Sequence, residues 1–370
     1  MNKRILYIGL TDIDDKYNGV TQKVKSQIDS LKSLGYECIF AGYKNNQIII
    51  NDKVLPVKNS KLRRYKLMKE VLSHLSENAY DYLYLRYPHT DYMVIKVLKE
   101  FKRKGTKVFL EFPTYPIKYP ISSLSSIVHL VNSKVFNKYL KKYVDKSISI
   151  GTQTNKIFGI DNISVPNGFN QSKIDYFNIP EMGSINIVSA SHFYDVHGYD
   201  RLIKGMGRYY QQDGEKIEIS LNLIGDGPEK EKLVRLVKTN KLEDKVIFHG
   251  IKDSQTINEM LSKSNMGCGP LAAHRSNLTF ASPLKTKDYF KNGIPFICSY
   301  NEIMVPDNFP YIHKFDSDDS DINIDEIVDF FKTYKDNYKK HSDQMRQYGL
   351  DYLTWGSIME GIFRSEVQDR

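Results

Sequence analysis

Residues 281–296 read ASPLKTKDYFKNGIPF, a polar helical pattern that passes through a Gly-X-Pro step into an apolar strand. Lys285 and Asp288 are three positions apart in this stretch, so on a helix they share one face. A cation and a carboxylate on that face suit a phosphate and a sugar hydroxyl, although such pairs also occur as solvated surface couples. The surrounding sequence has to decide between these two interpretations.

Apolar runs of strand length alternate with helical patterns through the first half of the chain. Short apolar strands separated by helices indicate a parallel sheet that is covered on both faces. We expect strands at 5–10, 36–42, 82–87, 107–112 and 146–150, and helices near 20–35, 61–77, 90–104 and 122–143. The first half is therefore predicted to be a doubly wound α/β domain.

The same alternation starts again after residue 180. A length of 370 residues fits two domains, and Pro, Asn and Gly cluster in a linker-like stretch at 165–180. We therefore predict an α/β fold of two doubly wound, Rossmann-like domains that face a central cleft. In the second half we expect strands at 184–191, 219–225, 246–250, 266–271 and 295–299, and helices near 198–211, 228–239 and 254–263.

The predicted domains are residues 1–170 and 171–347. An amphipathic pattern with the only tryptophan follows at 348–367. We expect one helix there, which either packs back on the first domain or is an ordinary final core helix.

Composition restricts the class of protein. Hydrophobic residues make up 41% of the chain, enough for a core in each half, and no run approaches the roughly 18 apolar residues of a membrane-spanning helix. The start of the chain reads as a first strand and not as a signal peptide, because Gly9 and then Asp12 interrupt its apolar run. The three cysteines are far apart, which favours reduced thiols and a cytoplasmic protein.

Positive charge is concentrated in the first half. Residues 1–180 contain 29 Lys and Arg against 15 Asp and Glu, whereas the remainder contains 24 against 29. Such a half suits nucleic acid, anionic lipid or a phosphorylated substrate, and a general enrichment in lysine is the alternative explanation. No nucleic-acid-binding module is recognisable, so we do not expect nucleic acid as a partner.

Loops after the predicted strands of the second half carry candidate anion-binding residues. In open α/β sheets, ligands bind beyond the carboxyl ends of the strands, where helix N-termini face them. The loop SHFYDVHGYDR (191–201) contains His192, His197 and Arg201. These side chains can neutralise a diphosphate.

Three further loops carry candidates. Gly225 and Gly227 form a Gly-Asp-Gly-Pro turn, which is either a phosphate-facing turn or simply a well-made start of a helix. Arg275 follows the strand at 266–271. Gly19 opens the first helix of the chain and offers a second N-terminus to an anion.

An ordered set of motifs resembles glycosyltransferase family 4, whose members use nucleotide-sugar donors, have the GT-B fold and retain the anomeric configuration. The motifs are VPNGF (165–169), HGYDRLI (197–203), IGDGPEKEKL (224–233), VIFHG (246–250) and SPLKTKDYFKNGIPFI (282–297). The resemblance implies that residues 1–170 bind the acceptor and that residues 171–347 bind the nucleotide-sugar donor.

The resemblance also assigns roles to residues of the second domain. His192 and His197 align with an Arg and a Lys that hold the donor diphosphate in the family, so Arg201, Arg275 and above all Lys285 are expected to supply the missing charge. Asp288 aligns with the second Glu of an E-x7-E motif and is expected to bind the ribose hydroxyls. The first Glu of that motif is replaced by Phe280.

In the first domain, Glu111 ends a strand near the place where many relatives carry an active-site histidine. Glu111 is expected to orient the acceptor or donor hydroxyls or to accept the acceptor proton. The alternative is a strand-end carboxylate that caps the following Pro-rich turn. Arg86 ends the preceding strand and is expected to pair with Glu111 or to meet an acceptor phosphate.

The resemblance implies transfer of a hexose from a nucleotide-diphospho-sugar, with a UDP-sugar as the expected donor. The acceptor would be a hydroxyl of a glycan or a lipid-diphosphate-linked glycan in bacterial surface polysaccharide or glycoconjugate synthesis. Glu111, His197 and Lys285 are the expected catalytic residues, without a metal or other cofactor. A nucleotide-sugar epimerase or a phosphorylase of the same architecture, or a non-catalytic anionic-surface binder, are the alternatives.

The stretch from Tyr115 to Lys146 has apolar positions at helical spacing and many lysines. It is expected to contact anionic lipids at the inner face of the membrane, where a lipid-linked acceptor would be found. An ordinary amphipathic helix that packs on the sheet is the alternative.

Overall fold

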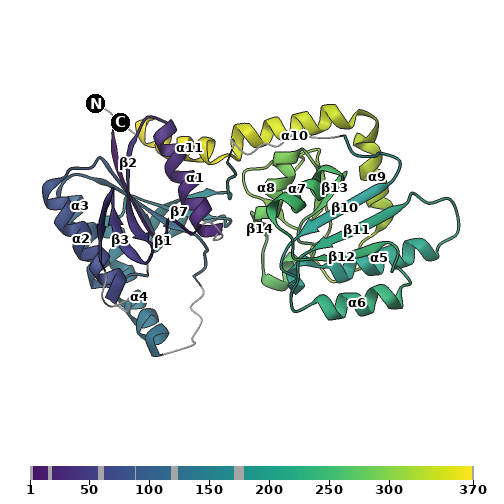
Figure 1. Cartoon of the computed structure of the whole chain (residues 1–370), viewed down its shortest axis with the longest axis horizontal. Coiled ribbons are helices and arrows are strands. Elements are labelled where there is room, and N and C mark those ends of the chain that lie inside the picture. Colours follow the sequence, from purple (N-terminus) through teal and green to yellow (C-terminus); the bar gives the residue numbers. More distant parts are fainter. Residues whose placement is uncertain are drawn as a thin grey trace. The chain divides into compact units, whose positions relative to one another are not determined.

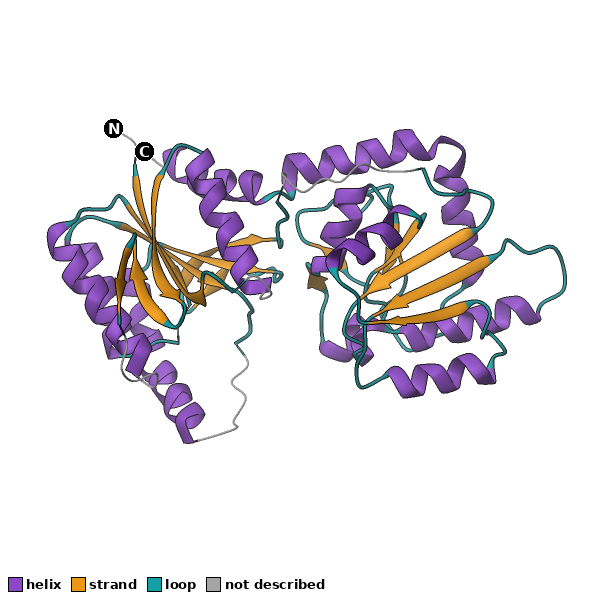
Figure 2. Ribbon diagram, in the orientation of Figure 1, coloured by secondary structure: helices purple, strands orange, loops and turns teal. Residues whose placement is uncertain are grey.

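The computed structural model describes residues 3–15, 19–56, 62–87, 89–117, 124–170 and 179–368. The chain forms two compact units (Figure 1): unit 1 contains Met1–Asn170 and Trp355–Arg370, and unit 2 contains Gln171–Thr354. Each unit is a largely parallel sheet with helices on both faces (Figure 2). The α/β class predicted from the alternating pattern is therefore confirmed.

Unit 1 has a nine-stranded sheet in the order β4-β3-β2-β1-β5-β6-β7-β9-β8. The central strands from β2 to β9 are parallel, and antiparallel hairpins form both edges. The strands are β1 (Arg4–Asp12), β2 (Glu37–Lys44), β3 (Gln47–Ile50), β4 (Lys53–Leu55), β5 (Tyr82–Arg86), β6 (Lys107–Phe112), β7 (Lys146–Ile150), β8 (Lys156–Ile157) and β9 (Ile160–Val165).

Two apolar clusters fill the two faces of this sheet. Leu67, Val97 and Leu140 from α2, α3 and α4 pack on one face, whereas Val24 of α1 and Trp355 of α11 pack on the other. Fully burying one aliphatic side chain stabilises a fold by about 1.5–3 kcal/mol. The helices are α1 (Gly19–Ser33), α2 (Arg63–Glu77), α3 (Tyr92–Arg103), α4 (Leu124–Tyr143) and α11 (Trp355–Gln368).

Unit 2 has a six-stranded parallel sheet in the order β12-β11-β10-β13-β15-β17. A short parallel pair, β14 with β16, lies apart from it. The strands are β10 (Ile185–Ala190), β11 (Ile219–Ile224), β12 (Val246–Gly250), β13 (Met266–Cys268), β14 (Phe280–Ala281), β15 (Phe296–Cys298), β16 (Asn301–Glu302) and β17 (Ile312–Lys314).

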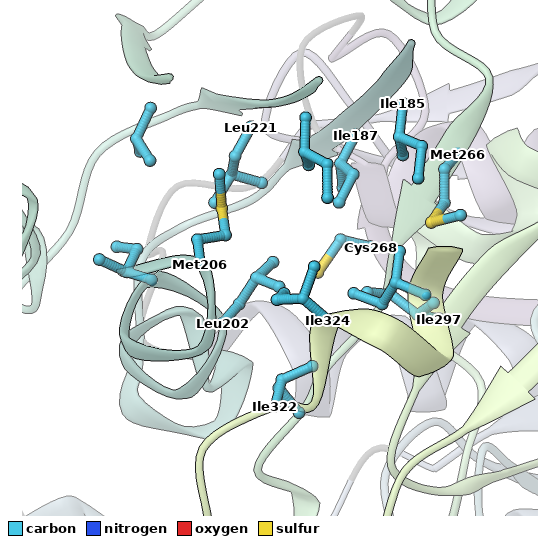
Figure 3. Close-up of a cluster of buried hydrophobic side chains, with 14 of the residues drawn as sticks. Ile185, Ile187, Leu202, Met206, Leu221, Met266, Cys268, Ile297, Ile322 and Ile324 are labelled. Atoms are coloured by element: carbon cyan, nitrogen blue, oxygen red, sulfur yellow. The ribbon is translucent and has the colours of Figure 1, made fainter. Parts of the chain in front are cut away.

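The main core of unit 2 lies between this sheet and helices α5, α6 and α9, and Figure 3 shows part of it. Ile187 and Leu221 of the sheet face Leu202 and Met206 of α5, and all four side chains are fully buried. The helices of unit 2 are α5 (Tyr199–Gln211), α6 (Lys230–Thr239), α7 (Ser254–Ser262), α8 (Leu284–Asn292), α9 (Ile324–Tyr334) and α10 (Tyr338–Tyr352).

The segment 348–367 was expected to form a single helix, and this expectation is wrong. Helix α10 ends at Tyr352 in unit 2, and α11 begins at Trp355 in unit 1. The backbone N–H of Trp355 donates to the carbonyl of Phe169 (3.1 Å), and its ring packs on Gly168, where a Cβ would lie 2.7 Å from the ring. Docking of this tryptophan on the Pro-Asn-Gly segment thus coincides with the break.

Candidate functional site

The carboxyl ends of β10 and β13 lie at the topological switch point of unit 2. Strands β11 and β12 lie on one side of β10, and the chain then continues with β13 on the other side. Ligands of open α/β sheets bind beyond the strand ends at such a point. Helix α5 begins close to the end of β10, so its N-terminus and the associated partial positive charge lie at the same edge.

Lys285 lies in the first turn of α8, and its ammonium group reaches the end of β10. Nζ donates to Ser189 Oγ (3.0 Å) and to Tyr199 OH (3.2 Å), and it lies 3.2 Å from Nδ1 of His197. The residue is only 8% exposed. Within the described part of the chain, no carboxylate forms an ion pair with this lysine.

The electrostatics of this contact leave one uncompensated charge. Burial lowers the pKa of Lys285 from 10.5 to about 8, so the ammonium is still protonated at neutral pH. Burial and the neighbouring charge of Lys285 lower the pKa of His197 to about 3, so the imidazole is neutral and its Nδ1 can accept the hydrogen bond. A buried cation with only neutral partners favours an anionic ligand, which would compensate its desolvation.

Two partners of Lys285 were not predicted from the sequence. Ser189 and Tyr199 hydroxyls are 2.7 Å apart, and Ser191 Oγ lies 2.6 Å from the same tyrosine hydroxyl. Ser189 also donates to the carbonyl of Cys268 on β13. The signal was a pair of serines at the end of an apolar strand, SINIVSAS (184–191), because buried hydroxyls there need polar partners.

The two predicted donor-binding glycines shape the turn between β11 and α6. Gly225 has a φ of +128°, and a Cβ there would lie 1.9 Å from the carbonyl oxygen of Ser191. A Cβ at Gly227 would lie 2.4 Å from the backbone nitrogen of Phe193. Only glycine allows this close approach, so the turn supports the loop that follows β10.

Asp288 lies one turn after Lys285 on α8 and is partly buried. Burial raises the pKa of its carboxyl from 3.8 to about 6, although Lys291 and Lys287 oppose this change. Within the described residues, its carboxylate makes no hydrogen bond or ion pair. A half-buried carboxylate without a partner suits a hydroxyl donor, as the predicted ribose contact requires.

The arginines are already engaged inside unit 2. Arg201 is 1% exposed and donates to the carbonyls of Leu271, Ser320 and Asp316 and to Asp318 Oδ1 (3.0 Å). These contacts join α5 to two loops. The expected role of Arg201 in donor binding therefore stays a prediction that this geometry does not favour.

Arg275 is held in a similar way. Its guanidinium forms a bidentate pair with Asp200 (2.9 and 3.0 Å) and also contacts Asp319 (2.7 Å). These hydrogen bonds, above all those that Arg275 donates to Asp200, raise the pKa of Arg275 further. A donor phosphate would have to compete with two carboxylates for this side chain, so its role too stays a prediction.

His192 lies on the surface of the loop after β10. Its ring packs edge-on against Tyr194, with ring centroids 4.6 Å apart, and the side chain is exposed. The structure therefore separates the two predicted histidines by environment, since His197 is half-buried beside Lys285 while His192 is exposed.

Phe280, which stands where the family motif would have its first Glu, lies on β14. The adjacent strand β16 carries Glu302, paired in register with Ala281. This carboxylate is 3% exposed and accepts hydrogen bonds from Lys287 (2.5 Å) and Thr286 (2.7 Å). Glu302 thus provides a carboxylate near the position of Phe280, where the motif lacks its first Glu, but both of its oxygens accept hydrogen bonds from residues of α8.

In unit 1, Glu111 is completely buried at the end of β6. Its Oε2 accepts hydrogen bonds from Gln27 (2.9 Å) and Tyr84 (2.8 Å), and its Oε1 lies 3.5 Å from Arg86 Nη1. Burial alone would raise the pKa of Glu111, but Arg86, Lys23 and these hydrogen bonds lower it below 4.5. The predicted pairing of Arg86 with Glu111 is seen, and the carboxylate is not exposed to solvent, so its expected catalytic role stays a prediction.

Lys23 was not predicted and lies beside this pair. It is on α1, where Nζ donates to Asn167 Oδ1 (3.1 Å) and lies 5.3 Å from the ring centre of Trp355. Burial lowers its pKa to about 8, although Glu111 opposes the change. Gly19 begins the same helix, and no atom lies within 4 Å of a Cβ built there.

Two further observations concern the whole described part of the chain. Within residues 3–15, 19–56, 62–87, 89–117, 124–170 and 179–368, no group of three or more His, Cys, Asp or Glu side chains is arranged to hold a metal ion. None of the helices in these ranges is both long and apolar enough to span a membrane.

Comparison with known proteins adds a family-model match over part of the chain and a fold. Residues 173–299 match the family model of glycosyl transferases group 1, which supports a glycosyltransferase. No curated protein sequence matches the chain. The matched segment contains the switch point, Lys285 and Asp288.

Solved structures of similar fold cover nearly the whole chain. HepE from Anabaena in complex with UDP is 12% identical (TM-score 0.60), covering 99% of this chain and 100% of that protein. A glycosyltransferase from Rickettsia africae is 13% identical (TM-score 0.65), covering 98% of this chain and 97% of that protein. Sucrose-phosphate synthase from Thermosynechococcus elongatus is also 13% identical (TM-score 0.62), covering 99% of each chain. These similarities confirm the predicted fold class, two Rossmann-like domains as in GT-B glycosyltransferases.

Proposed function

We propose that this chain is a glycosyltransferase that binds a nucleotide-diphospho-sugar in unit 2 and transfers its sugar to an acceptor hydroxyl. The observation that carries the proposal is the buried ammonium of Lys285, which contacts three neutral groups at the switch point of the sheet. The donor diphosphate is the anion that would compensate this charge. The family match over residues 173–299 supports the same function.

In the proposed reaction, the bond between the sugar and the diphosphate breaks while a bond to the acceptor oxygen forms, and negative charge grows on the leaving diphosphate, which takes up the proton of the acceptor hydroxyl. Lys285 and the N-terminus of α5 stabilise that charge where it develops. His197 stays neutral and positions the ammonium through Nδ1. Asp288 accepts hydrogen bonds from the ribose hydroxyls.

We propose that unit 1 binds the acceptor. Glu111 is buried in this structure, so we assign it a positioning role: it holds Arg86, and with Arg86 it sets the end of β5 and β6. Among the described residues of unit 1, we assign Lys23 and the N-terminus of α1 to ligand binding. The transfer retains the anomeric configuration and uses no metal, as the resemblance to glycosyltransferase family 4 implies.

The nature of the substrates is a further part of the proposal. HepE, similar in fold, has been solved with UDP and with UDP-glucose, which supports a UDP-hexose donor. A lipopolysaccharide outer core galactosyltransferase, WaaB, is also similar in fold, at 18% identity and a TM-score of 0.55. We therefore propose a glycan or lipid-diphosphate-linked glycan as acceptor, in the synthesis of a bacterial surface polysaccharide or glycoconjugate.

A donor panel tests this function. The purified chain is incubated with UDP-, GDP- and dTDP-sugars, and the melting temperature and the release of nucleoside diphosphate are measured. We expect one nucleotide class to raise the melting temperature and to be hydrolysed slowly. No response to any donor would contradict the transferase function, and conversion of the sugar to its epimer without release of nucleoside diphosphate would identify an epimerase.

A further inference from the structure

Helix α4 has a row of apolar side chains on its outer face. Ile127, Val131, Val135 and Tyr139 follow one another at steps of four residues, and they are 42%, 53%, 46% and 44% exposed. Residues at this spacing lie next to each other along one side of a helix. At 1.5 Å per residue the row is about 18 Å long.

The inner face of the same helix buries polar as well as apolar side chains. Ser133 is completely buried, Asn137 is 6% exposed and Leu140 is completely buried. Asn137 Oδ1 accepts a hydrogen bond from Tyr87 OH (3.1 Å), whereas Ser133 Oγ has no partner among the described residues. An ordinary amphipathic helix that packs on a sheet would bury its valines and expose its serine and asparagine. In α4, by contrast, Val131 and Val135 are exposed while Ser133 and Asn137 are buried.

Lysines accompany the apolar row. Lys134, Lys138, Lys141 and Lys142 are all exposed, and α4 contains no Asp or Glu from Leu124 to Tyr143. Lys138 Nζ lies 5.1 Å from the ring centre of Tyr139, so basic and apolar groups share one surface. We call this surface, formed by the four apolar residues and the four lysines, the α4 face.

We propose that the α4 face lies on the surface of an anionic lipid bilayer. At a bilayer surface the apolar row can enter the boundary between headgroups and acyl chains, while the flexible lysines extend to the phosphates. An apolar groove of a partner protein would desolvate the interleaved lysines without neutralising them. Nucleic acid would pair with the lysines but leave the valines in water. The bilayer is the partner that satisfies both kinds of side chain.

Vesicle flotation tests this surface with the whole chain and without any sugar substrate. Binding is measured to vesicles of phosphatidylglycerol and phosphatidylcholine, and to vesicles of phosphatidylcholine alone. Two variants remove one property each: Val131→Ser/Val135→Ser removes apolar area, and Lys138→Gln/Lys142→Gln removes charge. The matched control is Lys69→Gln/Lys238→Gln, which removes two exposed lysines outside α4.

We expect the unaltered chain and the control to bind the anionic vesicles. The lysine variant should bind about 30-fold more weakly, since each surface lysine contributes roughly fivefold. The valine variant should lose at least about tenfold on the same vesicles. The proposal would be overturned if the unaltered chain did not bind, or if both α4 variants bound the anionic vesicles as tightly as the unaltered chain. If the unaltered chain self-associates in sedimentation experiments and the valine variant does not, the partner of the α4 face is a second copy of the chain and not a bilayer.

The test is independent of the proposed enzymatic function. Lys285 belongs to unit 2, so Lys285→Ala should bind the vesicles like the unaltered chain. Vesicle binding that is lost together with Lys285 would contradict the assignment to α4.

Discussion

Replacement of Lys285 by methionine should stabilise the free protein and weaken donor binding strongly. Methionine keeps the length of the side chain and removes its charge. Burial lowers the pKa of Lys285 from 10.5 to about 8, and one pKa unit corresponds to about 1.4 kcal/mol, so the buried charge costs the free protein roughly 3 kcal/mol at neutral pH. We expect Lys285→Met to raise the free energy of unfolding by about 2 kcal/mol, because some hydrogen bonding is lost as well.

The pH dependence of stability provides a second check on the sign of the effect of Lys285. The folded-state pKa is lower than the unfolded-state value, so between about pH 8 and 10.5 the unfolded state binds more protons and the stability of the free protein rises with pH. Urea unfolding of the unaltered chain and of Lys285→Met over this range should show the difference shrinking as the pH rises. The affinity for the donor should fall roughly 100-fold in the variant, since a charge-assisted contact to the diphosphate is lost.

Lys287 provides a matched control on the same helix. It is also buried, but its Nζ is paired with Glu302 (2.5 Å). Lys287→Met should therefore destabilise the protein, by about 3 kcal/mol, because it leaves a buried carboxylate unpaired. Equal effects of the two substitutions on stability, or full donor affinity in Lys285→Met, would refute the distinction between an uncompensated and a compensated lysine.

Three other substitutions test the surroundings of the site. Asp288→Asn should stabilise the free protein by about 1–2 kcal/mol above pH 6, where the buried carboxyl is charged, with little effect near pH 3, below the unfolded-state pKa of 3.8. It should also weaken donor binding about tenfold; urea unfolding and calorimetry check both, and equal gains at the two pH values would exclude this cause. Gly225→Ala should cost about 3 kcal/mol, because its Cβ would meet the carbonyl of Ser191, and a loss below about 0.5 kcal/mol in urea unfolding would show that the turn relaxes easily. Glu111→Gln should cost about 3 kcal/mol near pH 7 by leaving Arg86 unpaired. The folded-state pKa of Glu111 is lowered, so its contribution is present above about pH 4.5 and is lost as the pH falls further, and acid unfolding of the two proteins should converge; a gap that persists in acid would contradict the ion pair as the cause.

Much of the fold could be predicted because local pattern and tertiary structure agree. The apolar runs that become β1, β5 and β6 are continuous and short, as expected for strands covered on both faces. The hairpin of β2 and β3 was missed, although its turn residues Asn45 and Asn46 have positive φ and are typical of a hairpin connection. Strand β3 lies near the edge of the sheet, and the sequence of a short, isolated QIII run does not distinguish a strand from a loop.

The candidate site could be predicted only in part. Spacing placed Lys285 and Asp288 on one face of α8, and the structure has both on that helix. Spacing could not reveal that Arg275 meets Asp200, since the two residues are brought together only by the folding of separate loops. The complete burial of Glu111 was not predicted either, because a carboxylate at the end of a strand is expected to be exposed.

Proton uptake on donor binding tests the central claim, a buried ammonium that is compensated by the donor diphosphate. Near pH 9 most free Lys285 would be neutral, because its pKa is lowered to about 8, and a bound diphosphate would bring its proton back. Calorimetry in buffers of different ionisation enthalpy should therefore show most of one proton taken up near pH 9, almost none near pH 7 from this group, and none from it in Lys285→Met at either pH. Donor binding with no extra uptake near pH 9, or with the same uptake in Lys285→Met, would contradict the claim.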